Sequence, residues 1–322
     1  MSLVALPSYG GISFSSLGDL PGGDFDSSAF GVSSNLTTVV GQGRSASGAE
    51  AFRWTADGGM VGLGALPGGS LFSSAATGVS GDGTTVVGYS IAASGFGAFR
   101  WTESSGMVAL GDLPGGSDSS LAYGISDDGG TVVGKSRSSA GLEAFRWTAD
   151  GGMVGLGYLP GGAFQSEALG VSGDGTSVVG LSSSASGIEA FRWTADGGMV
   201  GLGDLPGGNF ESYALGVSGD GMTVVGYGLT ASGSEAFIWD EDHGMRRIVD
   251  LLVEGGIDMS GWSLHRAAGI SVDGRVVVGR GSIAGRTEAW RIVLDGPTVP
   301  EPKPVVMLAS LVLGGAAFFR RT

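Results

Sequence analysis

The chain has 322 residues, of which 65 are glycine and none is cysteine, and its formal net charge is −14. Glycine does not recur at every third position, which excludes a collagen-like chain, and an apolar content of 42% argues against general disorder. The lack of cysteine excludes disulfides and cysteine–zinc sites. With 17 basic residues against 31 acidic ones, no nucleic-acid partner is expected, because a phosphate backbone needs a basic surface.

The N-terminal segment 12–20 predicts a strand that ends at the Pro-Gly-Gly of 21–23, because proline cannot donate to a ladder. After it, the phrases Leu-Pro-Gly-Gly, Val-Val-Gly and Ala-Phe-Arg-Trp-Thr recur with a period of 46 or 47 residues through most of the chain. A fixed period of this length is typical of repeat architectures. The third phrase begins at Ala51, Ala98, Ala144 and Ala190, and returns in altered form at Ala236 and Ala289.

Each repeat predicts four short strands. In the fourth repeat these are 168–172, a Thr-x-Val-Val-Gly strand, 189–194 and 199–205. Asp-Gly between two apolar runs is a strong hairpin signal, and the consecutive valines of the second strand indicate burial on both faces. The sequence therefore favours an all-β fold.

Four strands in about 46 residues is the size of one propeller blade. The last repeat ends after its third strand, near 290–294, while the segment 12–20 is a strand without a repeat of its own. These observations predict a six-bladed β-propeller over 1–296 whose ring is closed by the N-terminal strand; an open β-solenoid is the alternative. The repeats span approximately 24–69, 70–116, 117–162, 163–208, 209–256 and 257–296.

The sixth repeat is preceded by an insertion at 245–256 in place of Leu-Pro-Gly-Gly. Apolar residues at 248, 249, 251 and 252 predict a short helix, which Gly255 ends. The insertion has two interpretations, a packing plug at the ring closure or a binding site where the symmetry is broken.

A proline-rich linker, 297–304, follows the repeats, and the tail 305–322 predicts a short hydrophobic helix. The uncharged stretch 305–319 is shorter than the about 20 residues of a comfortable membrane span. It could insert with local thinning of the bilayer, with the terminal arginines on the cytoplasmic side, or pack as a core helix.

This tail resembles the PEP-CTERM sorting signal of exopolysaccharide-producing Gram-negative bacteria. The matching elements are Pro300-Glu301-Pro302, the apolar stretch 305–319, and Arg320-Arg321. The resemblance implies export, transient retention in the inner membrane, and cleavage near the tail by an exosortase. The first residues, 1–7, have neither the basic nor the apolar stretch of a signal peptide, so export implies a leader that this sequence does not contain.

The repeats resemble the HAF family of bacterial extracellular repeats over about 17–294. The phrases that carry this resemblance are Leu-Gly-Asp-Leu-Pro-Gly-Gly, Gly-Val-Ser-Gly-Asp-Gly-Thr-x-Val-Val-Gly and Glu-Ala-Phe-Arg-Trp-Thr. It implies an extracellular repeat protein with no assigned activity and no catalytic residues. The family's third motif usually begins with histidine, and here that position holds Glu50, Gly97, Glu143, Glu189, Glu235 and Glu288.

Candidate chemistry is sparse. The two histidines, His243 and His265, lie near the insertion, and a Ser-His-Asp triad is formally possible although nothing positions one. The histidines could also bind a metal with Asp242, Glu254 or Asp258, although the ligand spacing of known zinc motifs is missing. The repeated turn aspartates either serve their turns or bind calcium. They are Asp82, Asp128, Asp174, Asp220 and Asp273, with Asp57, Asp150 and Asp196 in the following turns.

Phe52 and Trp54 and their equivalents point the same way along their strands, either into the core between blades or towards a bound sugar. The arginines between them, at 53, 100, 146 and 192, point the other way, to pair with acids of neighbouring blades or to line a ring of positive charge.

Taken together, the sequence predicts an exported, non-catalytic binding or scaffold protein of the cell surface or extracellular matrix, in an exopolysaccharide or biofilm context. Close copies of one repeat favour a scaffold over an enzyme, because a catalytic site on a propeller needs different residues from different blades. Its expected partners are an exopolysaccharide or another surface protein, and no cofactor is expected. The alternative is an extracellular polysaccharide-acting enzyme with its site near 243–266.

Overall fold

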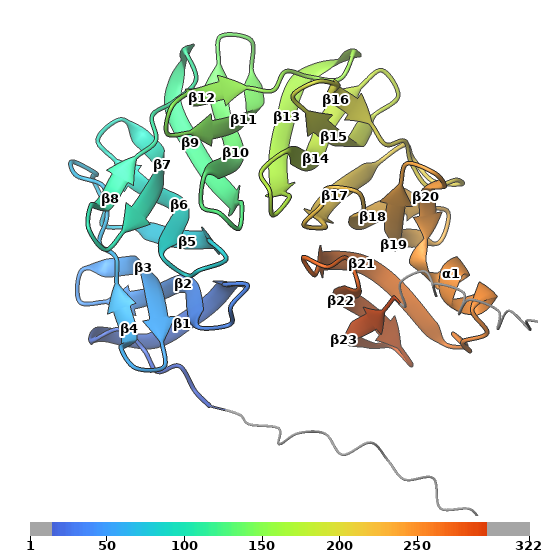
Figure 1. Ribbon diagram of the computed structural model, residues 1–322, viewed down its shortest axis with the longest axis horizontal. Coiled ribbons are helices and arrows are strands. Elements are labelled where there is room, and N and C mark those ends of the chain that lie inside the picture. The colour runs from blue at the N-terminus through green and yellow to red at the C-terminus, as the bar shows by residue number, and fades with distance from the viewer. Residues whose placement is uncertain (1–14, 295–322) are drawn as a thin grey trace, which may run out of the picture.

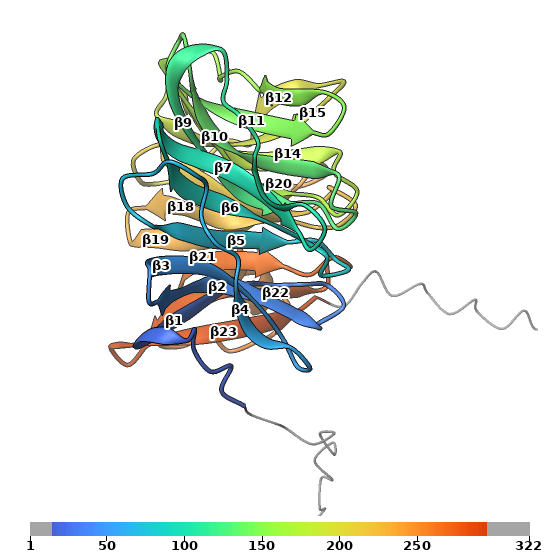
Figure 2. The same ribbon diagram turned by 90° about the vertical axis from the view of Figure 1, so that its left-hand side faces the viewer.

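The computed structural model describes residues 15–294. Apart from one short helix, α1 (Ile248–Glu254), these residues form an all-β structure. Its sheets follow one another around a central axis in an open ring (Figure 1), and the strands run obliquely across the thickness of the ring (Figure 2). This is the arrangement of a β-propeller rather than of a β-solenoid. The helix confirms the prediction made from the insertion, and Gly255 is its C-cap.

Residues 15–294 form five sheets. The first sheet contains β1 (Gly22–Val32), β2 (Thr38–Ser45), β3 (Gly48–Thr55) and β4 (Gly59–Gly62). The second contains β5 (Ser74–Val79), β6 (Thr85–Ala92), β7 (Gly95–Thr102) and β8 (Gly106–Ala109). The double sheet contains β9 (Gly115–Ile125), β10 (Thr131–Ser138), β11 (Leu142–Thr148), β12 (Gly152–Gly155), β13 (Gly161–Val171), β14 (Ser177–Ser184), β15 (Ile188–Thr194) and β16 (Gly198–Gly201). The penultimate sheet contains β17 (Ser212–Val217), β18 (Val224–Thr230), β19 (Gly233–Asp240) and β20 (Gly244–Arg247), and the last sheet β21 (Trp262–Ile270), β22 (Val276–Ile283) and β23 (Arg286–Val293).

The prediction of six separate four-stranded blades is therefore wrong. Four sheets consist of complete sets of four strands, and one of them is a double set because Leu142 on β11 pairs with Gln165 on β13. At two other junctions the corresponding contact is only an isolated bridge, between Ala49 and Ser73 and between Ile188 and Glu211. The last sheet has three strands within the described residues, because no Met-Val-Gly phrase follows β23 in the sequence.

Closure of the ring by the segment 12–20 is also not observed. Residues 15–20 are not in a strand, and residues 12–14 lie outside the described part of the chain. Gly18 has a φ of 80°, close to the 81° of Gly64, which links the first sheet to the second. Leu20 is buried beside Gly43 of its own first sheet. The segment therefore packs on the sheet that follows it, and Figure 1 shows the first and last sheets on either side of an opening.

The fourth strand is shorter than predicted, because the chain turns at a glycine before it reaches the second linker leucine. The predicted strand 199–205 is observed as β16, Gly198–Gly201. Gly203 then adopts a φ of 79°, which only glycine tolerates well, and turns the chain towards the next sheet. Leu205 is buried there in the core that joins the two sheets.

The core lies between successive sheets. In each sheet, one surface meets the next sheet along the chain, and we call it the forward face. In the first sheet Val40 and Ala51 belong to it. The opposite surface, the backward face, meets the preceding sheet, and in the second sheet it contains Ala76, Val86 and Phe99. The linker leucines, such as Leu63 and Leu66, pack between the two faces. This set repeats at each later junction in the described chain.

The hairpin turns between the first two strands of each repeat point towards the middle of the ring (Figure 1). Their backbones are joined from one turn to the next. The Gly81 N–H donates to the Asp127 carbonyl at 2.9 Å, and the Asp127 N–H donates to the Gly173 carbonyl at 3.0 Å. Similar bonds connect Asn35 to Gly81, Asp174 to Gly219, and Gly219 to Val272. The turns therefore form a continuous hydrogen-bonded inner rim.

Candidate functional site

The two histidines make unrelated contacts. His243 is exposed in the turn after β19, where its Nδ1 lies 2.7 Å from an oxygen of Asp240. The other oxygen of Asp240 accepts a hydrogen bond from Arg246 at 2.6 Å. Burial alone would raise the pKa of Asp240, but the hydrogen bonds from His243 and the charge of Arg246 lower it. The carboxylate thus holds a turn together.

His265 lies on β21, where its Nε2 is 2.8 Å from the hydroxyl of Ser282 on the neighbouring strand. It has no acidic partner among its hydrogen bonds in the described chain. Within residues 15–294, no group of three histidine, aspartate or glutamate side chains is placed to hold a metal ion. The predicted set of His243, His265, Asp242, Glu254 and Asp258 is therefore not brought together.

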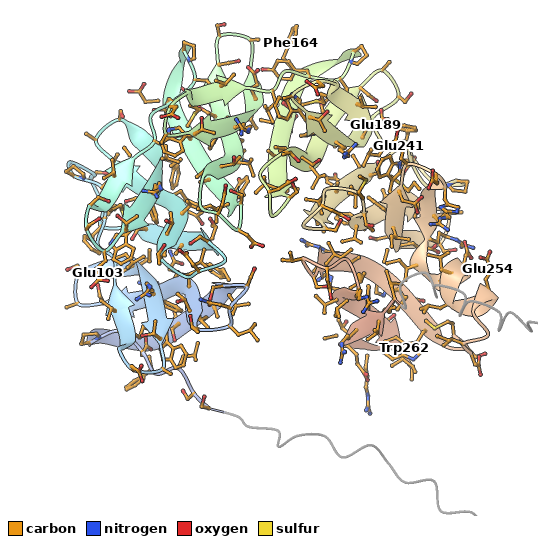
Figure 3. The ribbon with its side chains drawn as sticks, in the orientation of Figure 1. Glu103, Phe164, Glu189, Glu241, Glu254 and Trp262 are labelled. Atoms are coloured by element: carbon orange, nitrogen blue, oxygen red, sulfur yellow. The ribbon has the colours of Figure 1, made fainter. Side chains whose placement is uncertain are left out.

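The insertion packs as a plug. Ile248 of α1 is buried, and Leu251, Leu252 and Trp262 pack against the core between the penultimate and last sheets. Figure 3 shows Trp262 in the last sheet and Glu254 on the outer side of the helix. A cavity of about 360 Å³ remains beneath the insertion, and its lining is mostly apolar. The packing supports the plug interpretation.

The turn aspartates bind their own turns. In Asp82, one carboxylate oxygen accepts hydrogen bonds from the hydroxyl of Ser80 at 2.6 Å and from the Thr84 N–H at 3.0 Å. These bonds lower the pKa of Asp82, and the Ser218 hydroxyl does the same for the pKa of Asp220. The five carboxylates of the inner turns are engaged locally, which agrees with turn chemistry and gives no support to a calcium site. In the turns of Asp57, Asp150 and Asp196 a threonine hydroxyl accepts the turn N–H instead.

The repeated aromatic residues are core residues, as one of the two interpretations held. Phe52, Phe99, Phe145, Phe191 and Phe237 are fully buried. The half-buried arginines between them donate to carbonyl and hydroxyl oxygens rather than to acids of neighbouring sheets. The Arg53 Nε donates to the Gly83 carbonyl of the next inner turn at 3.2 Å, and Arg192 repeats this bond to Gly221 at 3.0 Å. These two arginines fasten their sheets to the turn that follows, whereas Arg100 and Arg146 donate to threonine hydroxyls of their own sheets.

The glutamates that begin the third strand have a structural role that the sequence reading did not assign. The carboxylates of Glu50, Glu143 and Glu189 accept a hydrogen bond from a linker N–H, and in Glu189 the donor is Gly203 at 3.1 Å. The spacing of 14 residues between acceptor and donor repeats in all three. A repeated acid at a fixed distance before a glycine was the signal that could have revealed it.

Exposed aromatic rings lie along the outer rim of the sheets. Phe164, which follows Leu-Pro-Gly-Gly, is 63% exposed and sits at the rim in Figure 3. Tyr158 meets it edge to face at a centroid distance of 5.3 Å. Phe96 and Tyr89 form a similar pair at 6.0 Å. The positions equivalent to Phe164 hold Phe25, Phe72 and Phe210, of which the first two are exposed and the third half-buried.

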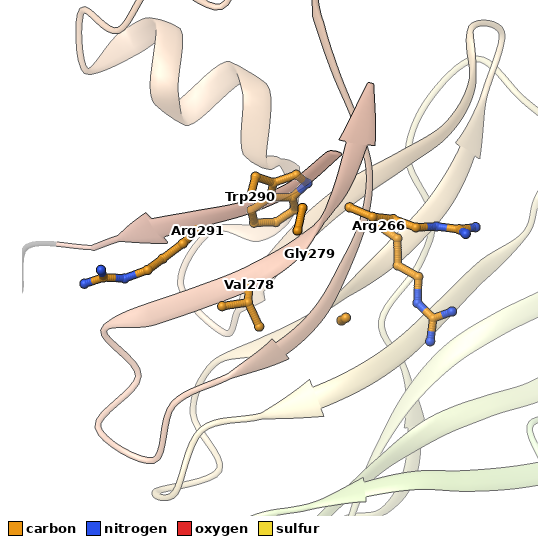
Figure 4. Close-up of a pocket in the computed structure, with 8 residues that line it drawn as sticks. Arg266, Val278, Gly279, Trp290 and Arg291 are labelled. Atoms are coloured by element: carbon orange, nitrogen blue, oxygen red, sulfur yellow. The ribbon is translucent and has the colours of Figure 1, made fainter. Parts of the chain in front are cut away.

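A second surface lies on the forward face of the last sheet, where a cavity of about 610 Å³ opens beside the gap in the ring. Arg266, Arg280 and Arg291 line it together with Val278 and Trp290. Figure 4 shows the Trp290 ring over Gly279, with Arg266 and Arg291 extending to opposite sides. The Trp290 Nε1 is buried and has no hydrogen-bond partner among residues 15–294. This cluster of cations was not predicted from the sequence, because its strands come together only in the folded sheet.

The predicted sorting residues, Pro300, Glu301, Pro302, Arg320 and Arg321, lie outside the described residues. The same holds for the apolar stretch 305–319. Within residues 15–294, no helix has both the length and the apolar character that a membrane crossing requires.

No family model and no curated protein matches this sequence. Solved structures do match the fold. The β-propeller domain of the Trilobed protease from Pyrococcus furiosus, described as having an open velcro topology, shares 10% identity with a TM-score of 0.53. The match covers 85% of this chain and 82% of that one. It supports the β-propeller fold and, at this identity, nothing further.

Two TolB structures are more distant in geometry. TolB from Acinetobacter baumannii shares 12% identity with a TM-score of 0.49, over 69% of this chain and 53% of that one. This chain therefore spans about half of that protein's length. A putative TolB from Agrobacterium tumefaciens shares 14% identity with a TM-score of 0.48, over 84% of this chain and 90% of that one.

Proposed function

We propose that this protein is an exported, non-catalytic binding and scaffold module of the bacterial cell surface or extracellular matrix, and that its outer rim binds a neutral glycan. The observation that carries this proposal is the set of aromatic rings at equivalent rim positions, Phe25, Phe72, Phe164 and Phe210. Rings at equivalent positions present a repeated apolar contact along the rim, and an aromatic face can stack on a sugar ring.

The geometry of the rim suits a repeating ligand. Phe164 and Phe96 are each held at their edge by a tyrosine, so their rings are oriented before a ligand arrives. Equivalent sites on neighbouring repeats would bind successive units of a polymer and raise the overall affinity by multivalency. The net charge of −14 would repel an acidic polysaccharide, which favours a neutral one.

The alternative function, a polysaccharide-acting enzyme near 243–266, has less support. Its discriminating feature is an acidic pair that converges with a histidine in a cleft. Within the described residues, His243 lies in an exposed turn and His265 is bonded to Ser282.

The glycan proposal is tested by binding of the full chain to an array of neutral and acidic glycans, followed by titration of the best ligand. We expect saturable binding without turnover, and at least tenfold weaker binding by Phe72→Ala/Phe164→Ala, since stacking contacts carry the affinity. Val253→Ala, an exposed apolar residue of α1, is the matched control. Turnover of the glycan, or equal binding by the double variant, would contradict the proposal. Capture of acidic glycans alone would contradict its charge argument.

Export and sorting form a separate part of the proposal, supported by the tail motif at 300–322. We expect the intact mass of the protein from culture medium to show loss of the tail after roughly residues 300–304, through cleavage by an exosortase at the inner membrane. Substitution of Arg320 and Arg321 by alanine should retain the protein in the cell. A full-length protein confined to the cytoplasm would contradict this part.

A further inference from the structure

The forward face of the last sheet is not covered by another sheet in the described structure. Val278, on this face, is 44% exposed, whereas the equivalent Val40, Val87, Val133, Val179 and Val225 are each 0% exposed. Each of those five valines is covered by the backward face of the following sheet. The last sheet therefore presents a half-interface of the same kind.

The backward face of the first sheet is the missing half. Ala29 and Val32 belong to it, and Val32 is 55% exposed. The equivalents of Ala29 in the later repeats, from Ala76 to Ala267, are fully buried. Leu20 already packs beside Gly43, in the same way as the linker Leu205 packs beside Gly228 of the penultimate sheet. The first sheet thus has its own interface leucine in place.

Polar contacts across the existing junctions give the register that these two faces would adopt. Lys135, directly after Val-Val-Gly, forms a 3.1 Å salt bridge with Glu167 of the following repeat. At the last junction, Tyr227 meets Arg266 in the same two positions, 5.8 Å from ring centroid to guanidinium carbon. In this register Arg280 of the last sheet would face Ser28 of the first.

A second polar contact of the existing junctions, from a third-strand arginine to an inner turn, agrees with the same register. Two third-strand arginines reach a carbonyl in the following inner turn, since Arg53 donates to Gly83 and Arg192 to Gly221. Arg291 is the equivalent arginine of the last sheet, and the equivalent carbonyl of the first sheet belongs to Leu36. Leu36 has a φ of 61°, which resembles the 76° of Gly83, and it is 78% exposed. Its turn thus has the shape that Arg291 would require.

Charge favours the same pairing. The last sheet, 262–293, contains five arginines against two acidic residues and has a net charge of +3. The first sheet and its leading segment, 15–62, contain two arginines against five acidic residues and have a net charge of −3. Oppositely charged surfaces associate faster and in a defined register. A cationic sheet in a chain of net charge −14 is otherwise unexplained.

We propose that the forward face of the last sheet binds the backward face of the first sheet of a second copy of this chain. A second copy is favoured over closure within one chain because the intervening junctions, which repeat one arrangement, hold the two faces apart in the open ring (Figure 1). The contact is heterologous, so each dimer still offers both faces, and longer head-to-tail assemblies follow.

Cysteine cross-linking tests the register, since the natural chain has no cysteine. Full-length Ser28→Cys and Arg280→Cys are mixed under mild oxidation. We expect a disulfide-linked dimer of the mixture, and a ladder of oligomers from the double variant. Ser186→Cys, in the exposed loop between β14 and β15, replaces Ser28→Cys as the control and should give no dimer. An unlinked mixture, or a double variant that links only within single chains, would overturn the proposal.

Sedimentation of the unmodified full chain tests the assembly itself. We expect concentration-dependent association below roughly 0.1 mM. Arg280→Glu should weaken it about tenfold, and Ser28→Glu/Arg280→Lys, which rebuilds the Lys135–Glu167 pair, should keep it. A chain that stays monomeric throughout, including one whose faces are covered by its own residues 1–14 or 295–322, overturns the proposal.

Discussion

At the scale of single residues, three of the repeated glutamates bind the linker that leads to the next sheet. Glu189 and Glu103, both labelled in Figure 3, make a useful contrast. Glu189 accepts a hydrogen bond from the linker Gly203, whereas Glu103 is exposed in a turn. The second sheet has Gly97 in place of the glutamate, so the natural chain tolerates the loss of one of these glutamate–linker hydrogen bonds.

Glu189→Ala should lower the free energy of unfolding by about 1–2 kcal/mol, because the partly buried Gly203 N–H loses a charged acceptor. Glu189→Gln keeps an acceptor and should lose less. Urea unfolding followed by tryptophan fluorescence measures both. Glu103→Ala is the control and should stay within about 0.5 kcal/mol of the wild type. Equal losses of unfolding free energy in Glu189→Ala and Glu103→Ala would show that the hydrogen bond from Gly203 to Glu189 does not stabilise the fold.

The turn aspartates with a lowered pKa make the free energy of unfolding decrease as the pH falls. The hydrogen bond from Ser80 lowers the pKa of Asp82 in the folded state below its ordinary value of 3.8. The unfolded chain therefore binds more protons in the interval between the two values, and the contribution of Asp82 is complete above pH 3.8 and lost as pH falls through the folded pKa. Asp220 acts in the same sense.

Asn35 occupies the equivalent position of the first turn, where its oxygen accepts hydrogen bonds from Ser33 and Thr37. Asp82→Asn should therefore keep the turn, with a stability near that of the wild type at pH 7 and a smaller loss on acidification. Urea midpoints measured from pH 7 to about pH 3 give both curves. Asp82→Ala removes the acceptor and should lose about 1 kcal/mol at pH 7. Parallel curves for wild type and Asp82→Asn would contradict the assigned role.

At the scale of the elements, the glycine that ends each Val-Val-Gly phrase is set by a close approach of two strands. A methyl group on Gly180 would overlap the carbonyl oxygen of Glu167 on β13. At Gly226 the Phe237 ring also lies within 3.0 Å of such a methyl group. The phenylalanine of the third strand can lie flat against the second strand only because no side chain stands there.

Gly180→Ala should therefore lower the free energy of unfolding by roughly 3 kcal/mol or more, because rigid backbone blocks the new methyl group. Gly269→Ala is the matched change in another strand, since its methyl group would meet Val278 at an ordinary 3.9 Å. Thermal unfolding of the two variants should separate them clearly. Similar transition temperatures would mean that the strands can move apart at little cost.

The sequence predicted the elements well wherever neighbours along the chain determine them. The consecutive valines indicated burial on both faces, and Val178 and Val179 are both fully buried. The apolar pattern at 248–252 predicted α1. The predicted strand 199–205 was too long, because the apolar residues Leu202 and Leu205 are buried by the neighbouring sheet after the chain has turned at Gly203. The spacing of apolar residues indicates which positions are buried, but it does not distinguish a strand from a linker.

At the scale of the whole molecule, prediction from the sequence was weaker. Counting one spare and one missing strand predicted a closed ring, but Leu20 packs on its own sheet and leaves the last sheet with three strands in the described chain. Whether a ring closes depends on the angle at each junction, which side-chain packing sets and a repeat count does not record. The cationic face of Arg280 and Arg291 was missed for a related reason, since the two residues become neighbours only through the pairing of β22 with β23.

An open row of sheets also predicts how the molecule unfolds. Within the described residues each sheet packs mainly against its neighbours, so its stability is largely its own plus that of its junctions. The inner rim adds a longer link, because the Ser34 hydroxyl of the first sheet donates to Asp127 two repeats further on at 2.7 Å. The double sheet has a junction at each end and one within it, whereas the last sheet has only its backward junction. The side chains of β23 are mostly exposed, while the core positions of β14 and β15 are fully buried. The last sheet should therefore open before the rest of the ring.

Native-state hydrogen exchange followed by mass spectrometry measures this difference, and we expect amides of β22 and β23 to exchange at least roughly tenfold faster than those of β14 and β15 in dilute solution. If two copies associate through the last and first sheets, protection of β22 and β23 should rise with protein concentration, while β14 and β15 stay unchanged. Arg280→Glu should shift that rise to about tenfold higher protein concentration without altering exchange in the dilute sample, because it weakens the contact and leaves the fold. Uniform exchange across all sheets would instead mean that the open row unfolds as one cooperative unit, with junctions strong enough to compensate for the uncovered end.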